Sequence, residues 1–234
     1  MLLQRKLEEA ELFLFDLDGT LVKFHTDFLF DEAERILRLL NHSIVKRTAI
    51  EEGFRSFNFF GFVNPEEIPL SIFRDEFWKH FRSEQIPAPI ILPGAIETLE
   101  FLSKQGKILA LVTSRCEATE RVCQDLESVG LLHFFKSVVP RASNEFFWSD
   151  KQPQISQTCI NLGIPAEKSV MVGDVPPDAS SARLSGVSVV ISLLSGGLDR
   201  NVLEAENPDY LLDGVHQIPG LFSKPNFGDQ ILSR

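Results

Sequence analysis

The chain has 234 residues, of which 44% are hydrophobic and 24% are charged, and its formal net charge is −10. This composition is ordinary for a globular protein, and the acidic balance disfavours a broad surface for nucleic acid or for an anionic membrane. The three cysteines have no C-x-x-C spacing, so neither a disulfide framework nor a zinc site is expected. With no signal peptide and no apolar run of about 18 residues, we expect a cytoplasmic protein, a monomer or a homodimer, that binds neither nucleic acid nor membrane.

Five short apolar runs have the character of buried parallel strands, at residues 12–15, 107–113, 137–140, 169–173 and 187–192. Helix-like patterns lie between most of them and each ends at a glycine, at residues 95–106, 117–130, 153–163 and 178–186. Glycine is the residue that most often follows the end of a helix. Because strands alternate with helices, the sequence predicts a doubly wound α/β fold, in which helices cover both faces of a parallel sheet.

The interval between the first two strands breaks this alternation. Residues 23–90 contain helical patterns at 31–40 and 71–81 but no convincing buried strand, and eleven of the twenty phenylalanines fall there. The stretch 86–94 carries three prolines and is typical of a linker. We therefore predict an α/β core of residues 1–22 and 91–234, with a small helical cap of residues 23–90 inserted after the first strand. The phenylalanines are expected to form the core of the cap, and a face that contacts substrate is the alternative.

Polar residues follow the predicted strands at the edge where open parallel sheets bind their ligands. They are Asp16 and Asp18 after the first strand, Thr113 and Ser114 after the second, Lys151 at some distance after the third, and Asp174 and Asp178 after the fourth. This set fits phosphoryl transfer to or from a small-molecule phosphate ester. A carboxylate can attack phosphorus, a hard cation such as Mg²⁺ relieves the repulsion between the acids, and a lysine and a hydroxyl can hold the phosphoryl oxygens.

Four segments occur in the order and spacing of the haloacid dehalogenase-like hydrolase superfamily: FDLDGTLV (15–22), LVTS (111–114), Lys151 and VGDVPPD (172–178). Residues 178–197 and 207–222 also resemble the closing helix, strand and tail of its phosphoglycolate phosphatase-type members. The resemblance covers about residues 10–22 and 91–222. An insert between the first two motifs is what this family calls a C1 cap.

The resemblance implies a role for each matching residue. Asp16 is the nucleophile and a metal ligand, and Asp18 is the general acid and base, with its backbone carbonyl on the metal. Thr113, Ser114 and Lys151 bind the phosphoryl group, Asp174 ligates Mg²⁺, and Asp178 supports the metal site. The acid at position 18 favours phosphate esters, because the dehalogenases of the family lack it.

Several alternatives stay open at the level of the sequence. The expected function is a Mg²⁺-dependent phosphatase acting through an aspartyl-phosphate on a phosphoglycolate-like substrate or a sugar phosphate. A phosphomutase of the same fold needs the same acids and differs in how well the closed cap excludes water. A catalytically idle scaffold that binds a partner is the other alternative. Two residues also have second readings: Asp178 as the N-cap of the helix that follows, and Arg115 as a contact for the substrate phosphate.

Overall fold

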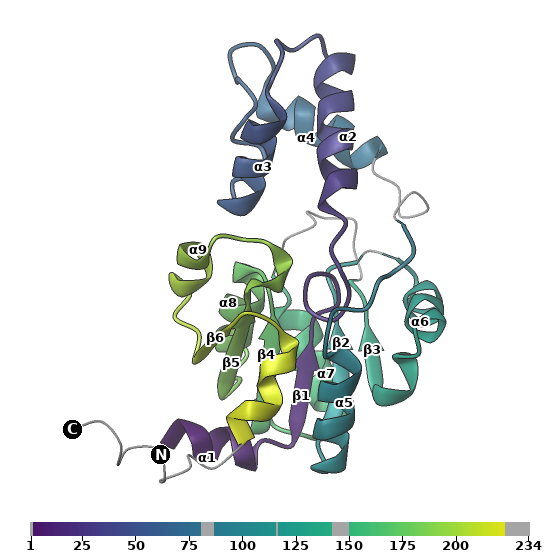
Figure 1. The fold of residues 1–234 in the computed structure, drawn as a ribbon, viewed down its shortest axis with the longest axis vertical. Helices are drawn as coiled ribbons and strands as arrows, with labels where there is room; N and C mark the ends of the chain where they lie inside the picture. Colours follow the sequence, from purple (N-terminus) through teal and green to yellow (C-terminus); the bar gives the residue numbers. More distant parts are fainter. Residues whose placement is uncertain (1, 81–86, 116, 142–149, 223–234) are drawn as a thin grey trace, which may run out of the picture.

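The computed structural model describes residues 2–80, 87–115, 117–141 and 150–222. Six parallel strands form one sheet in the order β3-β2-β1-β4-β5-β6 (Figure 1). Their bounds are Leu12–Phe15 (β1), Ile108–Val112 (β2), Ser137–Val139 (β3), Ser169–Gly173 (β4), Val189–Leu193 (β5) and Tyr210–Leu212 (β6). The predicted doubly wound α/β fold is confirmed. The five predicted strands are present: β1 and β4 have the predicted bounds, and the ends of the other three differ by at most two residues.

Helices cover both faces of the sheet. The central strand β1 is therefore buried on both sides, which explains why its sequence is apolar throughout. Phe13 and Phe15 belong to one buried cluster, whereas Leu12 and Leu14 belong to another on the opposite face. The first cluster lies under α1 (Leu2–Glu9), α5 (Ala95–Lys104), α6 (Thr119–Ser128) and the 3₁₀ helix η5 (Val215–Phe222). The second lies under α7 (Gln152–Leu162) and α8 (Pro176–Leu184). A strand covered on both faces has no solvent side to make polar.

Among the described α-helices and strands of the α/β core, three short ones were not predicted. In α1 a single residue, Leu7, is buried, so the helix lacks a long apolar face. The edge strand β6 has three residues, all only partly buried. The helix α9 (Arg200–Glu204) has five residues, with Leu203 buried. Each is too short for its periodicity to stand out from the flanking sequence.

The described residues of the segment inserted after β1 include the α-helices α2 (Thr26–Leu39), α3 (Arg47–Arg55) and α4 (Leu70–His80). The predicted helices at 31–40 and 71–81 correspond to α2 and α4, although α2 begins five residues earlier and residue 81 lies outside the described residues. The helix α3 was not predicted. These helices stand above the carboxyl ends of the strands (Figure 1).

The phenylalanines of the insert pack against one another. Phe30 and Phe54 are buried with ring centroids 5.6 Å apart in an edge-to-face arrangement, and Phe73 and Phe77 lie 6.2 Å apart. This supports the expected reading, in which they are the core of the cap. The cluster also continues into the α/β core through Val175, through Leu198 and through Leu203 of α9, so the cap and the core share apolar contacts.

The two chain segments that connect insert and core pair with each other. The Lys23 amide donates to the Ile90 carbonyl (2.7 Å), and the Leu92 amide donates to the Leu21 carbonyl (2.9 Å). The predicted division at residues 22 and 90 falls at this pairing, and we retain it as a proposal. Among the helices of the described residues, none has both the length and the apolar character needed to cross a bilayer.

Candidate active site

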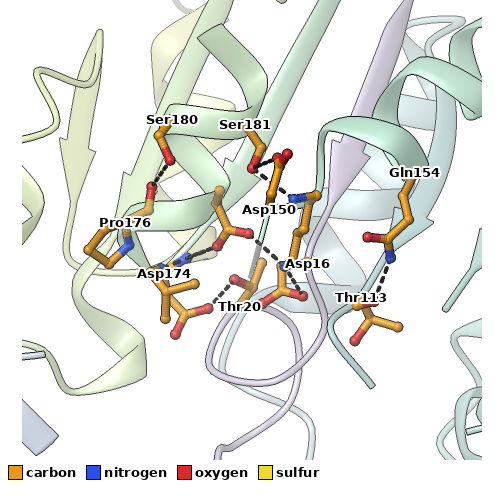
Figure 2. A network of polar contacts seen from close by, with 12 residues as sticks. Asp16, Thr20, Thr113, Asp150, Gln154, Asp174, Pro176, Ser180 and Ser181 are labelled. Carbon is orange, nitrogen blue, oxygen red and sulfur yellow. Dashed lines mark hydrogen bonds and ion pairs between the residues drawn. The ribbon is translucent and has the colours of Figure 1, made fainter. Parts of the chain in front are cut away.

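The turn after β1 brings the backbone against the carboxylate of Asp174. Gly19 has a φ of +82°, a conformation that favours glycine, and a Cβ atom at Gly19 or at Gly196 would overlap the Asp174 side chain. The Thr20 hydroxyl donates to Asp174 Oδ1 at 2.8 Å (Figure 2). The turn after β1 therefore packs closely against the end of β4, and the Asp174 side chain lies at this contact.

Lys151 joins two of the predicted acids. Its Nζ lies 2.7 Å from Asp16 Oδ1 and 2.6 Å from Asp178 Oδ1. The three side chains are almost completely buried, with 6% of Asp16 and 1% of Lys151 exposed. Burying an ammonium and carboxylates is costly unless they pair, so this geometry accounts for the lysine deep at the sheet edge.

Asp178 also holds the start of α8. Its Oδ2 accepts hydrogen bonds from the backbone amides of Asp174 (3.0 Å) and Val175 (3.2 Å). Since α8 begins at Pro176, Asp178 is the third residue of the helix and not its N-cap, which corrects that reading. One carboxylate thus satisfies otherwise unpaired amides at the helix start and contacts Lys151.

The backbone of Lys151 is fixed by groups that gave no signal in the sequence. The Lys151 amide donates to the Ser181 hydroxyl at 2.8 Å, and this hydroxyl donates to Asp150 Oδ1 at 2.9 Å (Figure 2). Ser181 lies on α8, thirty residues further along the chain. A contact of this kind depends on the packing of α7 against α8 and has no local pattern.

The buried acids strongly affect one another. Burial raises the pKa of Asp16 to about 7; Lys151 opposes this rise, whereas the carboxylates of Asp178 and Asp18 add to it. Burial, together with Asp16 and Asp178, raises the pKa of Asp174 well above its ordinary value. For Lys151, burial disfavours the charge, but Asp16 and Asp178 outweigh it and raise the pKa. The cluster therefore has more negative charge than its one lysine neutralises.

These carboxylates fit a divalent cation. Asp16, Asp174 and Asp178 each offer an oxygen, and the three oxygens lie within 4.8 Å of one another. Hard oxygen donors with excess negative charge are what Mg²⁺ and similar ions bind. The Asp18 carboxylate is not in this group, and the ligand expected from that residue is its backbone carbonyl.

The Asp18 side chain is paired with Arg115. Arg115 Nε lies 2.7 Å from Asp18 Oδ2, and Arg115 Nη2 lies 2.7 Å from Asp18 Oδ1. Arg115 Nη1 donates to Asp125 Oδ2 of α6, also at 2.7 Å. Burial disfavours the guanidinium charge, but the Asp18 carboxylate outweighs it and raises the pKa of Arg115. Arg115, for which a contact to the substrate phosphate was a second interpretation, is held between two carboxylates in this structure.

Thr113 ends β2 and is buried. Its Oγ1 accepts a hydrogen bond from the Arg115 amide (3.3 Å), and its carbonyl accepts one from Gln154 Nε2 (2.8 Å; Figure 2). Ser114 follows directly and is partly buried. The structure thus brings Asp16, Lys151, Asp174 and Asp178 together, and it links Thr113 to Asp18 through Arg115.

Five residues that support this site were not predicted from the sequence: Thr20, Asp125, Asp150, Gln154 and Ser181. Thr20 had a local signal, because it lies in the DGT segment directly after the two acids. The other four are positioned by tertiary contacts, so their sequence neighbourhoods did not mark them.

Comparison with known proteins places the chain in a family. Residues 13–192 match the family model described as haloacid dehalogenase-like hydrolase. A phosphoglycolate phosphatase of Agrobacterium fabrum is 30% identical over 231 residues, covering 92% of this chain and 94% of the relative. The phosphoglycolate phosphatase of Mesorhizobium japonicum is 29% identical, covering 83% and 87%.

Solved structures show the same fold. A protein of Haemophilus somnus, named as a predicted phosphoglycolate phosphatase, has a TM-score of 0.67 and 22% identity, and the match covers 92% of this chain and 99% of that one. A Thermotoga maritima protein with the provisional name β-phosphoglucomutase has a TM-score of 0.60 and 18% identity, covering 90% and 97%. At these identities the structures establish the fold alone. The family match covers most of the chain and the resemblance seen in its motifs is confirmed: this protein belongs to the haloacid dehalogenase-like hydrolases.

Proposed function

We propose that this protein is a Mg²⁺-dependent phosphatase that hydrolyses a small phosphate monoester through an aspartyl-phosphate on Asp16. The observation that carries the proposal is the buried pair of Asp16 and Lys151, next to Asp174 and Asp178 at the carboxyl edge of the sheet. A carboxylate in this position faces the edge where open parallel sheets bind ligands. The names of the family relatives support the same class of reaction.

Asp16 acts as the nucleophile in this mechanism. One of its carboxylate oxygens forms a bond to phosphorus while the bond from phosphorus to the leaving oxygen breaks. Lys151 holds Asp16 in place, and its ammonium offers positive charge to the phosphoryl oxygens as they gain charge. Asp16, Asp174 and Asp178 would hold a divalent cation, which would supply further charge neutralisation at this edge.

Asp18 moves the protons. It donates a proton to the leaving oxygen in the first step, which releases the alcohol. In the second step it accepts a proton from the water that attacks the aspartyl-phosphate, so that inorganic phosphate leaves and Asp16 is restored. Thr113 and Ser114, at the end of β2, are the proposed contacts for the remaining phosphoryl oxygens.

Phosphoglycolate is the first substrate to test, because relatives that match over most of their length carry that activity in their names. The sugar phosphates are the second class. A phosphomutase shares every residue named above, and no observation on this chain favours it. The two reactions differ in their product, which is inorganic phosphate for one and an isomerised sugar phosphate for the other.

The test measures phosphate release from p-nitrophenyl phosphate and from a panel of metabolites that includes phosphoglycolate, in Mg²⁺ and in EDTA. We expect release that requires the metal and that Asp16→Asn abolishes. The matched control is Asp75→Asn, which removes a largely exposed carboxylate from α4 of the cap and is expected to retain wild-type rates. Release that survives Asp16→Asn contradicts the nucleophile, and a folded wild type that releases no phosphate from any substrate points to a mutase or an idle scaffold.

A further inference from the structure

The contact between Arg115 and Asp18 fixes an orientation as well as a position. The guanidinium meets the carboxylate side-on, so that Nε and Nη2 each bond one oxygen, both at 2.7 Å. Two parallel bonds hold the plane of a carboxylate, which a single contact from a lysine does not do. A carboxylate has about four lone-pair sites. The two bonds from Arg115 use one such site on each oxygen, and each oxygen has a second lone-pair site that can take a proton or meet a reacting group.

Asp125 holds the guanidinium from its other side. Arg115 Nη1 donates to Asp125 Oδ2 at 2.7 Å, and the other Asp125 oxygen lies 3.5 Å from Arg121 Nε at the surface of α6. The charges therefore alternate along one row, from Asp18 through Arg115 and Asp125 to Arg121. With 6% of Arg115 exposed and both edges of its guanidinium engaged, this side chain is placed to act on Asp18 rather than to bind a substrate anion.

The backbone of Arg115 is anchored as well. Its amide donates to Thr113 Oγ1 at 3.3 Å, and its carbonyl accepts a hydrogen bond from the Arg141 amide at 2.9 Å. The guanidinium therefore extends from a fixed point at the end of β2 to the turn after β1. This connects two parts of the site that lie 97 residues apart in the chain.

We propose that Arg115 is a positioning residue for Asp18, and that Asp125 in turn holds Arg115. This inference rests on the proposed function, in which Asp18 transfers protons to and from the reacting oxygens. Proton transfer requires the carboxylate to lie within hydrogen-bond reach of the reacting oxygen. Asp18 lies in the turn after β1, where its backbone forms an isolated bridge with Val22. The paired guanidinium restrains the side chain, which this backbone pairing leaves able to rotate.

Leaving groups of different quality test the inference. An alkoxide needs a proton as it leaves, whereas p-nitrophenolate departs without one. We expect Arg115→Met to lower kcat/KM by about 100-fold for glycerol 2-phosphate, the size of a general-acid effect. For p-nitrophenyl phosphate we expect a loss of less than about fivefold. Arg115→Lys keeps the charge but not the paired geometry, and it is expected to lie between Arg115→Met and the wild type.

Two variants separate this role from a general effect of charge or folding. Arg121→Met removes a cation from the same row without touching Asp18, and it is expected to change both substrates by less than about twofold. Asp125→Asn keeps the shape of the second partner while weakening its hold on Arg115. It is expected to show a smaller loss than Arg115→Met with the same selectivity for the alkyl phosphate, and it serves as the test variant if Arg115→Met does not fold.

A double-mutant cycle completes the test. If Arg115 acts through Asp18, adding Arg115→Met to Asp18→Asn lowers kcat/KM for glycerol 2-phosphate by less than a further factor of about two. Equal losses on both substrates, or losses that simply multiply in the double variant, overturn the inference. These results are distinct from a failure of the proposed function, in which the wild-type protein itself releases no phosphate from either substrate.

Discussion

Lys151 is a single residue that joins two of the acids of this site. It is a long cation with almost no exposed surface, and it lies between Asp16, which directly follows β1, and Asp178 of α8. In isolation a lysine in a loop is a surface residue, and only its place after the third strand marked it in the sequence. The two acids were predictable in the same way, from their position after strands β1 and β4.

The residues that hold Lys151 in place were not predictable from local sequence. Ser181 is an ordinary small residue in α8, next to another serine, and nothing distinguishes the two by type. In the folded protein, Ser181 joins the Lys151 amide to Asp150, whereas Ser180 donates to the Pro176 carbonyl one turn back, at 3.2 Å. The difference depends on which face of α8 packs against α7, and this is set by tertiary packing rather than by local sequence.

The serine pair provides a matched experiment. Ser181→Ala removes the acceptor of the buried Lys151 amide, and we expect it to lower the free energy of unfolding by about 1–3 kcal/mol, the cost of an unsatisfied buried group. It should also slow phosphate release, because Lys151 loses a support. Ser180→Ala, on the exposed side of the same helix, is expected to leave both quantities close to wild type. Urea unfolding and rate measurements on the two variants check this, and equal effects would contradict the positioning role of Ser181.

At the scale of elements, alternating periodicity predicted the sheet and its covering helices well. Runs such as Leu12–Phe15 and Ser169–Gly173 are buried on both faces, so they appear in the sequence as uninterrupted apolar segments. Elements that are not buried on both faces were not predicted, among them β6, whose three residues are only partly buried. The pairing of insert and core through Phe54, Leu198 and Leu203 was also out of reach, because it joins segments that lie far apart in the chain.

The turn after β1 yields a prediction that separates backbone strain from collision. Gly19 and Gly130 both have positive φ values, +82° and +72°. A Cβ atom at Gly130 would meet nothing within 4 Å, whereas one at Gly19 would overlap the Asp174 carboxylate. We therefore expect Gly130→Ala to cost about 1 kcal/mol of stability, from conformation alone.

Gly19→Ala should cost clearly more than Gly130→Ala and should also abolish metal-dependent phosphate release, because Asp174 must move to make room. Chemical denaturation gives the first comparison and activity in Mg²⁺ gives the second. If Gly19→Ala matches Gly130→Ala in stability and stays fully active, the fit between the turn and Asp174 is looser than the structure indicates.

On the scale of the whole molecule, the excess of acid in the site links metal binding to stability. Asp16, Asp174 and Asp178 come from the end of β1, the end of β4 and the first turn of α8, so a cation bound to all three joins these elements. Because burial raises the pKa of Asp16 to about 7, above the value of about 3.9 for a free carboxyl, this group favours the folded state at low pH. Without metal, its contribution to stability falls as the pH rises from about 4 to about 7.

We expect a divalent cation to reverse this loss. In the proposed site, Mg²⁺ would bind the ionised carboxylates of the folded chain and compete with the proton on Asp16. At about one hundred times its Kd it should raise the free energy of unfolding by about 2.7 kcal/mol. We expect a higher melting temperature in Mg²⁺ than in EDTA, and a larger gain near pH 8 than near pH 6. Asp174→Asn should abolish the gain, whereas Asp75→Asn on the cap should retain it. A gain that survives in Asp174→Asn places the cation elsewhere, and a gain that shrinks as the pH rises contradicts the competition with the proton.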